Sequence, residues 1–213
     1  METGEQYKKN IDASLSWLST TETALGSINE IIQRARELTI YGASDTLSTD
    51  ARIAIADEVE QLRGNLMQIA NSDIEGRYIF AGFKTAEVPF DIDGVYHGDG
   101  GKMQWETAPG VTLEVNINGK DFEDDGVNIF FEALKFLEEN LRPGGDTGKL
   151  SNEALEKMDK AVTRVLSLRS IAGSRMNRME MASSRNFEEK INMTGLRSSL
   201  YDIDMAELLI NYQ

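Results

Sequence analysis

The sequence predicts an α+β protein, in which an elongated antiparallel bundle of three long helices carries a small inserted β-rich head. All three prolines and twelve of the eighteen glycines lie between Ser72 and Leu150. The flanks are therefore almost free of helix breakers, whereas the middle segment alternates apolar and polar residues and holds ten of the sixteen aromatic residues. We expect a discontinuous helical rod, residues 1–75 and 142–213, and a head, residues 76–141, with one short helix.

The first flank is expected to form two helices joined by a tight turn. From Gln6 to Tyr41, apolar residues recur at steps of three, four or seven, which is the spacing of one helix face. The stretch Gly42–Asp50 interrupts this pattern and offers Ser48, Thr49 or Asp50 as the N-cap of the next helix. Five aliphatic residues of that second helix advance by four, three, four and three, the spacing of a heptad seam: Ile55, Val59, Leu62, Leu66 and Ile69.

This seam is predicted to be bundle core. A fully buried aliphatic side chain contributes about 1.5 to 3 kcal/mol, so five of them contribute about 10 kcal/mol, which is comparable to the whole stability of a typical domain. The returning flank, residues 151–213, supplies a partner stripe that includes Val162 and Val165. As one helix it would be about 90 Å long. Between Ser183 and Arg197 the stripe becomes polar, which indicates either looser or intermolecular packing or a solvated face.

The middle segment is expected to form short strands and one helix. Alternating residues predict strands at 78–80, 94–97, 103–106 and 111–117. The glycine-rich stretch Gly98–Gly101 is expected to supply the positive φ values of a hairpin turn, and Asn118–Gly119 is a second turn signal. The stretch from Asn128 to Leu141 predicts a helix that ends before Pro143 and packs against the head or caps the bundle.

The sequence predicts no catalytic residue, no cofactor site and no metal site. The formal net charge of -14 argues against nucleic acid, and the chain contains no cysteine and a single histidine, His97. We interpret His97 as a surface residue, and Asp91, Asp93 and Asp99 as turn-forming residues rather than calcium ligands. No stretch is long and apolar enough for a membrane span, and the N-terminal residues lack a secretory signal pattern.

Several motifs, taken in order, resemble the flagellin superfamily. They cover essentially the whole chain: Ile32–Leu38, Gln68–Asn71, Gly76–Gly82, Ala172–Glu180 and Ser199–Glu207. Within that superfamily, the Gly76–Gly82 motif and the segment from Tyr96 to Phe122 resemble the hook-associated junction proteins more than the filament subunits.

This resemblance implies a non-enzymatic structural component of the bacterial flagellum that joins hook to filament. The implied partners are copies of the chain itself in a ring, a neighbouring hook-associated protein, flagellin and an export chaperone, with no nucleic acid and no membrane. Export through the flagellar secretion channel, without a cleaved signal peptide, would place the protein outside the cell. The superfamily has further polymerising helices at both ends, so we expect the chain to be a core fragment that stays monomeric alone.

The resemblance also implies assembly contacts between subunits at Gln33, Arg34, Arg36 and Glu58. The alternative is that these residues form ordinary surface salt bridges, which contribute about 0 to 1 kcal/mol each. Three other functions remain open. They are a flagellin that forms the filament, an extracellular coiled-coil scaffold or adhesin, and a hydrolase, which would need a pocket with carboxyl groups of raised pKa.

Overall fold

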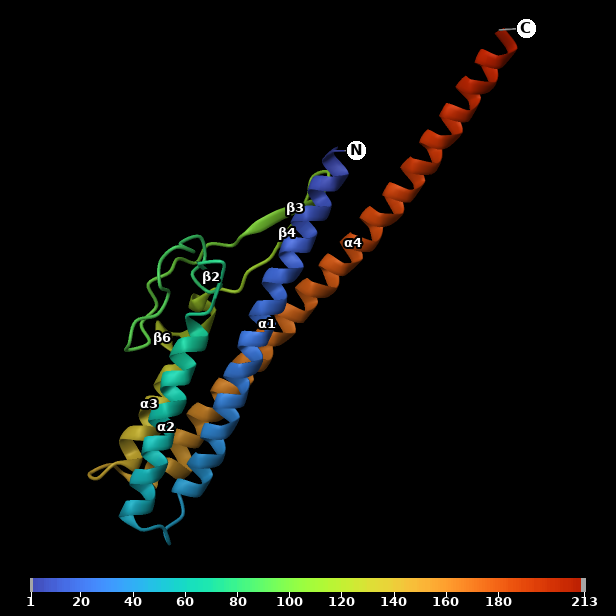
Figure 1. Cartoon of the computed structure of the whole chain (residues 1–213). Coiled ribbons are helices and arrows are strands. Elements are labelled where there is room, and N and C mark those ends of the chain that lie inside the picture. Colours follow the sequence, from blue (N-terminus) through green and yellow to red (C-terminus); the bar gives the residue numbers. More distant parts are fainter. Residues whose placement is uncertain (1, 212–213) are drawn as a thin grey trace.

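The computed structural model describes the backbone of residues 2–211 and the side chains of residues 4–199. Four α-helices dominate the described chain, namely α1 (Glu2–Gly42), α2 (Thr49–Ala70), α3 (Ile129–Leu141) and α4 (Leu155–Asn211). They form an elongated rod, with the loops and short strands of the head beside its middle (Figure 1). The expected α+β fold is therefore confirmed. The motif Ser199–Glu207 lies almost wholly outside the described side chains.

Helices α1 and α4 lie side by side and antiparallel, and together they form the column of the rod (Figure 1). Three ion pairs mark their register, because the α1 partners fall in number from 36 to 5 while the α4 partners rise from 159 to 190. The pairs are Arg36–Asp159 at 2.7 Å, Glu22–Arg169 at 2.6 Å and Glu5–Lys190 at 2.8 Å. Residues 5–36 of α1 are thus matched to residues 159–190 of α4, a length of about 45 Å.

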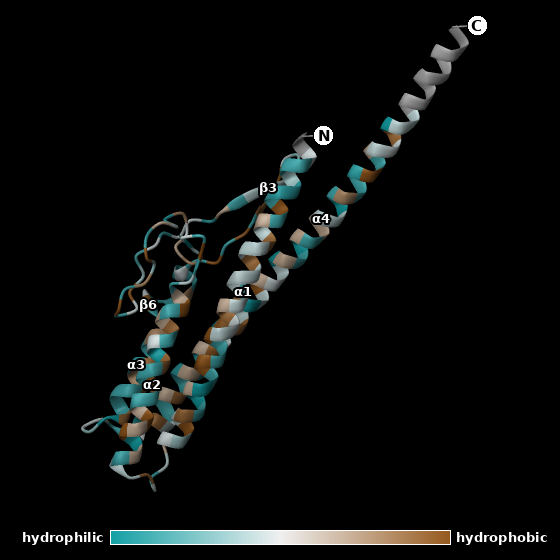
Figure 2. Ribbon diagram, in the orientation of Figure 1, coloured by the Kyte–Doolittle hydropathy of each residue, from teal (hydrophilic) through white to brown (hydrophobic). Residues whose placement is uncertain are grey.

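The interior of the rod is built from the residues with helical spacing. On α1, apolar side chains at steps of three, four or seven are fully buried, namely Ile11, Leu18, Leu25, Ile28, Ile32 and Ala35. Ile55, Val59 and Leu66 of α2 and Val165 of α4 are buried, whereas Leu62, Ile69 and Val162 are partly buried and pack against the same cluster. Figure 2 shows hydrophobic and hydrophilic residues interleaved along the helices, as expected of helices with one buried face.

Side-chain caps fix where two of the helices begin. The Ser48 hydroxyl accepts a hydrogen bond from the Ala51 backbone N–H at 3.2 Å and starts α2. The Asn128 side chain accepts from the N–H groups of Phe130 and Phe131 and starts α3.

Before α4, the chain forms a 3₁₀ turn, η2 (Thr147–Lys149), and a π turn, η3 (Leu150–Ala154). Helix α3 is the predicted short helix, and it lies beside α2 (Figure 1), so that it packs along the bundle as a fourth helix. The rod–head boundary at residue 141 stays a prediction.

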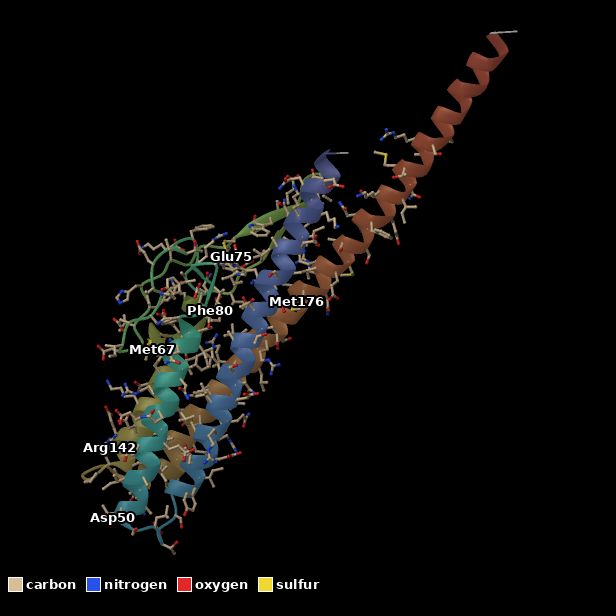
Figure 3. All side chains as sticks on the ribbon, in the orientation of Figure 1. Asp50, Met67, Glu75, Phe80, Arg142 and Met176 are labelled. Atoms are coloured by element: carbon tan, nitrogen blue, oxygen red, sulfur yellow. The ribbon has the colours of Figure 1, made fainter. Side chains whose placement is uncertain are left out.

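Three antiparallel pairs of short strands lie in the described head and at its junction with α2. They are β1 (Asp73–Ile74) with β2 (Arg77–Tyr78), β3 (Gln104–Ala108) with β4 (Val111–Glu114), and β5 (Glu123–Asp124) with β6 (Val127–Asn128). Both central residues of the turns Glu75–Gly76 and Asp125–Gly126 have positive φ, which is the type I′ geometry of two-residue hairpins. The ring of Phe122 lies 4.9 Å from that of Phe80 and 5.7 Å from that of Phe90, and these buried rings give the head its core. Figure 3 shows Phe80 at the upper end of α2.

The prediction of a hairpin turn at Gly98–Gly101 is wrong. Strand β3 instead pairs with β4 across Pro109 and Gly110, whose φ is +72°, while the predicted strand 94–97 makes a single bridge, from Phe90 to Tyr96. The glycine-rich stretch is a loop because the Asp99 carboxylate accepts hydrogen bonds from the N–H groups of Phe83 and Gly101. Of the predicted strand 78–80, only Tyr78 lies in a strand, β2, and the predicted strand 111–117 shortens to β4. Asn118, predicted to begin a turn, caps a 3₁₀ turn, η1 (Gly119–Phe122).

Candidate assembly surfaces

The titratable groups of the head serve its structure. His97 Nε2 lies 2.8 Å from Asp91 Oδ2, and this hydrogen bond, together with two backbone N–H groups that Asp91 accepts from, holds the pKa of Asp91 below its usual value. Burial raises the pKa of the Tyr96 hydroxyl, which donates to the carbonyl oxygens of Phe80 and Asp99. Asp91 and Asp99 therefore organise turns, and His97 is an exposed partner of Asp91.

One broad hollow of the described surface carries a carboxylate that is held in its charged form. It is an open groove of about 870 Å³ along the first turns of α4, beside Asp124 and Ile129. Its Glu156 carboxylate accepts a hydrogen bond from Lys160 at 2.8 Å, which lowers the pKa of Glu156 and keeps it charged. A general acid would need the opposite shift.

Membrane and metal sites are likewise missing from the part of the chain that the structure describes. Within it, no helix carries an apolar window long enough to cross a membrane. No three histidine, cysteine, aspartate or glutamate side chains of these residues gather around a point that could hold a metal ion.

The predicted assembly residues lie on the outside of the rod, where three of them also join helices of the same chain. Arg34 pairs with Glu58 at 2.8 Å and with Glu37 at 3.1 Å, which links α1 to α2. Arg36 pairs with Asp159 of α4. Gln33 is exposed, and the Arg34 and Glu58 side chains remain about half exposed. These residues therefore stay accessible to a neighbouring subunit, while Arg34, Arg36 and Glu58 also brace the rod internally.

A second charged cluster, which the sequence analysis missed, joins α2 to α3. Arg142, just after α3, reaches Asp57 at 3.2 Å, Glu60 at 2.7 Å and Glu138 at 3.2 Å. Arg63 of α2 also lies 3.3 Å from Glu138. Figure 3 shows Arg142 near the end of the rod that carries Asp50. Sequence spacing gives only the helical pair from Glu138 to Arg142, because the contacts to α2 depend on how the two helices pack.

The β3–β4 hairpin is fastened to both helices of the column. Asn10 of α1 donates to the Glu106 carbonyl oxygen at 2.9 Å. Arg175 of α4 pairs with Glu114 at 2.8 Å and donates to the Asn116 carbonyl oxygen. Figure 3 places Met176, the next residue of α4, where α4 runs alongside α1. The hairpin therefore presents a surface fixed relative to the column.

The polar stretch of α4 lies where the helix leaves its partner. Asn186 donates to the Gly4 carbonyl oxygen, and Lys190 reaches Glu5, which are contacts with the beginning of α1. Beyond them α4 continues past the start of α1 (Figure 1). Exposed apolar side chains occur along this part of the helix, namely Met181, Phe187, Ile191, Met193 and Leu196.

Comparison with known proteins links this rod to the bacterial flagellum. Residues 1–85 match the bacterial flagellin N-terminal helical region. Flagellar hook-associated protein 3 of Escherichia coli (strain K12) is 27% identical over 218 residues, which cover 92% of this chain and 69% of that protein. Flagellin of Bacillus subtilis (strain 168) is 25% identical over 95% of this chain and 69% of its own length.

A solved structure confirms the kinship at the level of the fold. The crystal structure of Bacillus cereus FlgL superposes with a TM-score of 0.77, at 26% identity, over 89% of this chain and 92% of that one. The resemblance to the flagellin superfamily, and within it to the hook-associated proteins, is therefore confirmed.

Proposed function

From this kinship with flagellar hook-associated protein 3, we propose that the chain is a structural subunit of the bacterial flagellum that joins the hook to the filament. The observation that carries the proposal is the α1–α4 column, in which segments from the two ends of the described chain run together for about 45 Å. A stiff column can hold its own sides in a fixed orientation, so that neighbouring copies meet through the same surfaces each time.

The relatives are structural proteins, and we infer that this chain likewise acts by assembly rather than by catalysis. Its proposed partners are copies of itself in a ring, the adjacent hook-associated protein and flagellin, with an export chaperone before assembly. The proposed location is outside the cell, after passage through the flagellar secretion channel. The hydrogen bonds and ion pairs within the head and the rod support this role, because they stabilise one fixed shape.

Electron microscopy of cells that lack the gene tests the junction role. We expect intact hooks and filaments that are shed into the medium, and normal filaments after the full-length gene is restored. Cells that keep their filaments attached without the gene would contradict the proposal.

A charge swap tests the proposed assembly contacts separately. The double variant Arg34→Glu/Glu58→Arg keeps an ion pair between α1 and α2, gives up the exposed pair Arg34–Glu37, and reverses both charges that face outward. If a neighbouring subunit uses these residues, the variant should fold normally and fail to retain filaments. The matched swap Glu156→Lys/Lys160→Glu reverses an exposed pair on α4 and should retain them. If cells with the first swap retained their filaments normally, Arg34 and Glu58 would serve only as a salt bridge within the subunit.

A flagellin role is the second candidate, supported by the match of residues 1–85 to the flagellin N-terminal region. Addition of the full-length protein to isolated hook ends separates the two. A flagellin should grow long filaments there, whereas a junction protein should stop after a short zone.

A further inference from the structure

A preformed groove lies where the β3–β4 hairpin crosses the column. It is lined by Tyr7 of α1, by Val111 of the hairpin and by Met181 of α4, and it has a volume of about 260 Å³. A second hollow of about 270 Å³ continues it past Pro109 and shares Tyr7 with it. Val111 and Met181 are 43% and 64% exposed. We call this pair of hollows the hairpin groove.

The hairpin groove needs no rearrangement to accept a partner. The bonds from Asn10 to Glu106 and from Arg175 to Glu114 already hold its walls, which are the hairpin and the two helices. Binding to a preorganised surface avoids the cost of ordering it.

The hairpin groove also carries positive charge that its own chain does not neutralise. Arg178 and Arg185 line it and form no ion pair among the described side chains, residues 4–199. They lie two helical turns apart on α4, about 10 Å. The other charged groups there are Glu189, Lys190, which is paired with Glu5, and Glu106, which accepts from the Gly110 N–H. A chain with net charge -14 thus keeps two unpaired arginines beside an apolar surface, which favours an acidic, apolar-tipped partner.

The head of the same chain presents a segment with this chemistry. Ile92 is 84% exposed, the largest fraction among the exposed large hydrophobic side chains that the structure describes. Asp91 and Asp93 flank it, and the turn is preformed because Asp91 Oδ1 accepts from the N–H groups of Asp93 and Val95. We call Asp91–Asp93 the head tip.

We propose that the head tip of one copy docks into the hairpin groove of the next copy. Ile92 would cover Val111 and Met181, and Asp93 would face the arginines of the groove. The head tip and the hairpin groove are formed by different segments of the chain, so one copy can offer its tip to one neighbour and its groove to another. Such a heterologous contact generates a ring when the rotation closes. The inference rests on the proposed ring of copies and adds a contact that would hold it.

Two single-cysteine variants test the contact directly, since the chain contains no cysteine of its own. Ile92→Cys and Met181→Cys proteins are mixed at millimolar concentration, comparable to the effective concentration between linked neighbours, and oxidised mildly. The mixed 92–181 dimer should form at least about tenfold faster than the dimer of Ile92→Cys with Leu166→Cys. Leu166 is an exposed leucine of α4 outside the groove.

Charge reversal supplies the second arm of the test. Adding Arg178→Glu and Arg185→Glu to the Met181→Cys protein should lower cross-linking to the control rate, and adding Asp93→Arg to the Ile92→Cys protein should restore part of it. Circular dichroism checks that each variant keeps its helix content. The inference would be overturned if the 92–181 dimer formed no faster than the control dimer, or if the arginine substitutions left its rate of formation unchanged. A preference for 92–92 or 181–181 dimers would overturn it as well. Filament retention in cells measures the junction role independently of this cross-linking. The proposed contact and the proposed junction role can therefore be contradicted separately.

Discussion

Leu66 of α2 is one of the largest fully buried side chains of the rod. Its replacement by alanine removes buried methyl groups and leaves a cavity, which costs about 2 to 5 kcal/mol of unfolding free energy. The variant Leu66→Ala should therefore lose that much in urea denaturation. The same change at Leu166, which is 49% exposed, should alter the unfolding free energy by less than about 0.5 kcal/mol. Equal effects at the two positions would contradict the assignment of the seam to the core.

Burial of single residues on the helices could be predicted from the sequence because a helix repeats every 3.6 residues. That is why Ile55, Val59 and Leu66 were expected in the core and are buried. The same reasoning placed Leu62 in the core, but its side chain is only partly buried, since a heptad seam identifies a face but not how wide the contact is. Ion pairs between helices, such as Arg36–Asp159, could not be predicted, because they depend on the register of two helices distant in sequence.

At the scale of the element, the β3–β4 hairpin depends on side chains outside its own strands. Arg175 is mostly buried and joins Glu114 and the Asn116 carbonyl oxygen to α4. The variant Arg175→Met should loosen the hairpin and speed amide hydrogen exchange in Gln104–Glu114 by about tenfold, the factor that corresponds to a lost contact of about 1.4 kcal/mol. Arg164→Met removes an α4 arginine without an ion pair among the described side chains and should leave that exchange unchanged. Unchanged exchange in both variants would show that the Arg175 contacts do not hold the hairpin.

Turn chemistry explains which elements of the head were predicted and which were not. The signals Glu75–Gly76 and Asp125–Gly126 mark two hairpins whose strands are only two residues long, too short for an alternating pattern to reveal. The stretch Gly98–Gly101 carries glycines without positive φ, because Asp99 bonds it to the rest of the head. A count of glycines therefore misplaced the turn, and Gly110 beside Pro109 was the better signal.

At the scale of the whole molecule, the proposed role as a connector depends on the α1–α4 column. The long flanks without prolines predicted two stretches of helix, and their apolar stripes predicted that they would pack against one another. The structure adds the register, in which contacts extend from Arg36–Asp159 to Glu5–Lys190. Stiffness over this length lets small side contacts, each contributing about 0 to 1 kcal/mol, act at fixed positions between neighbouring copies.

Spin-label distances along the column test this claim most directly. Cysteines replace both partners of one ion pair at a time, at positions 36 and 159, 22 and 169, or 5 and 190, and double electron–electron resonance measures the distance between the attached labels. The account predicts short, narrow distributions at all three levels, and about 45 Å for a control pair at positions 5 and 159. A long or broad distribution at positions 5 and 190 would contradict the column, and with it the proposed rigid connector.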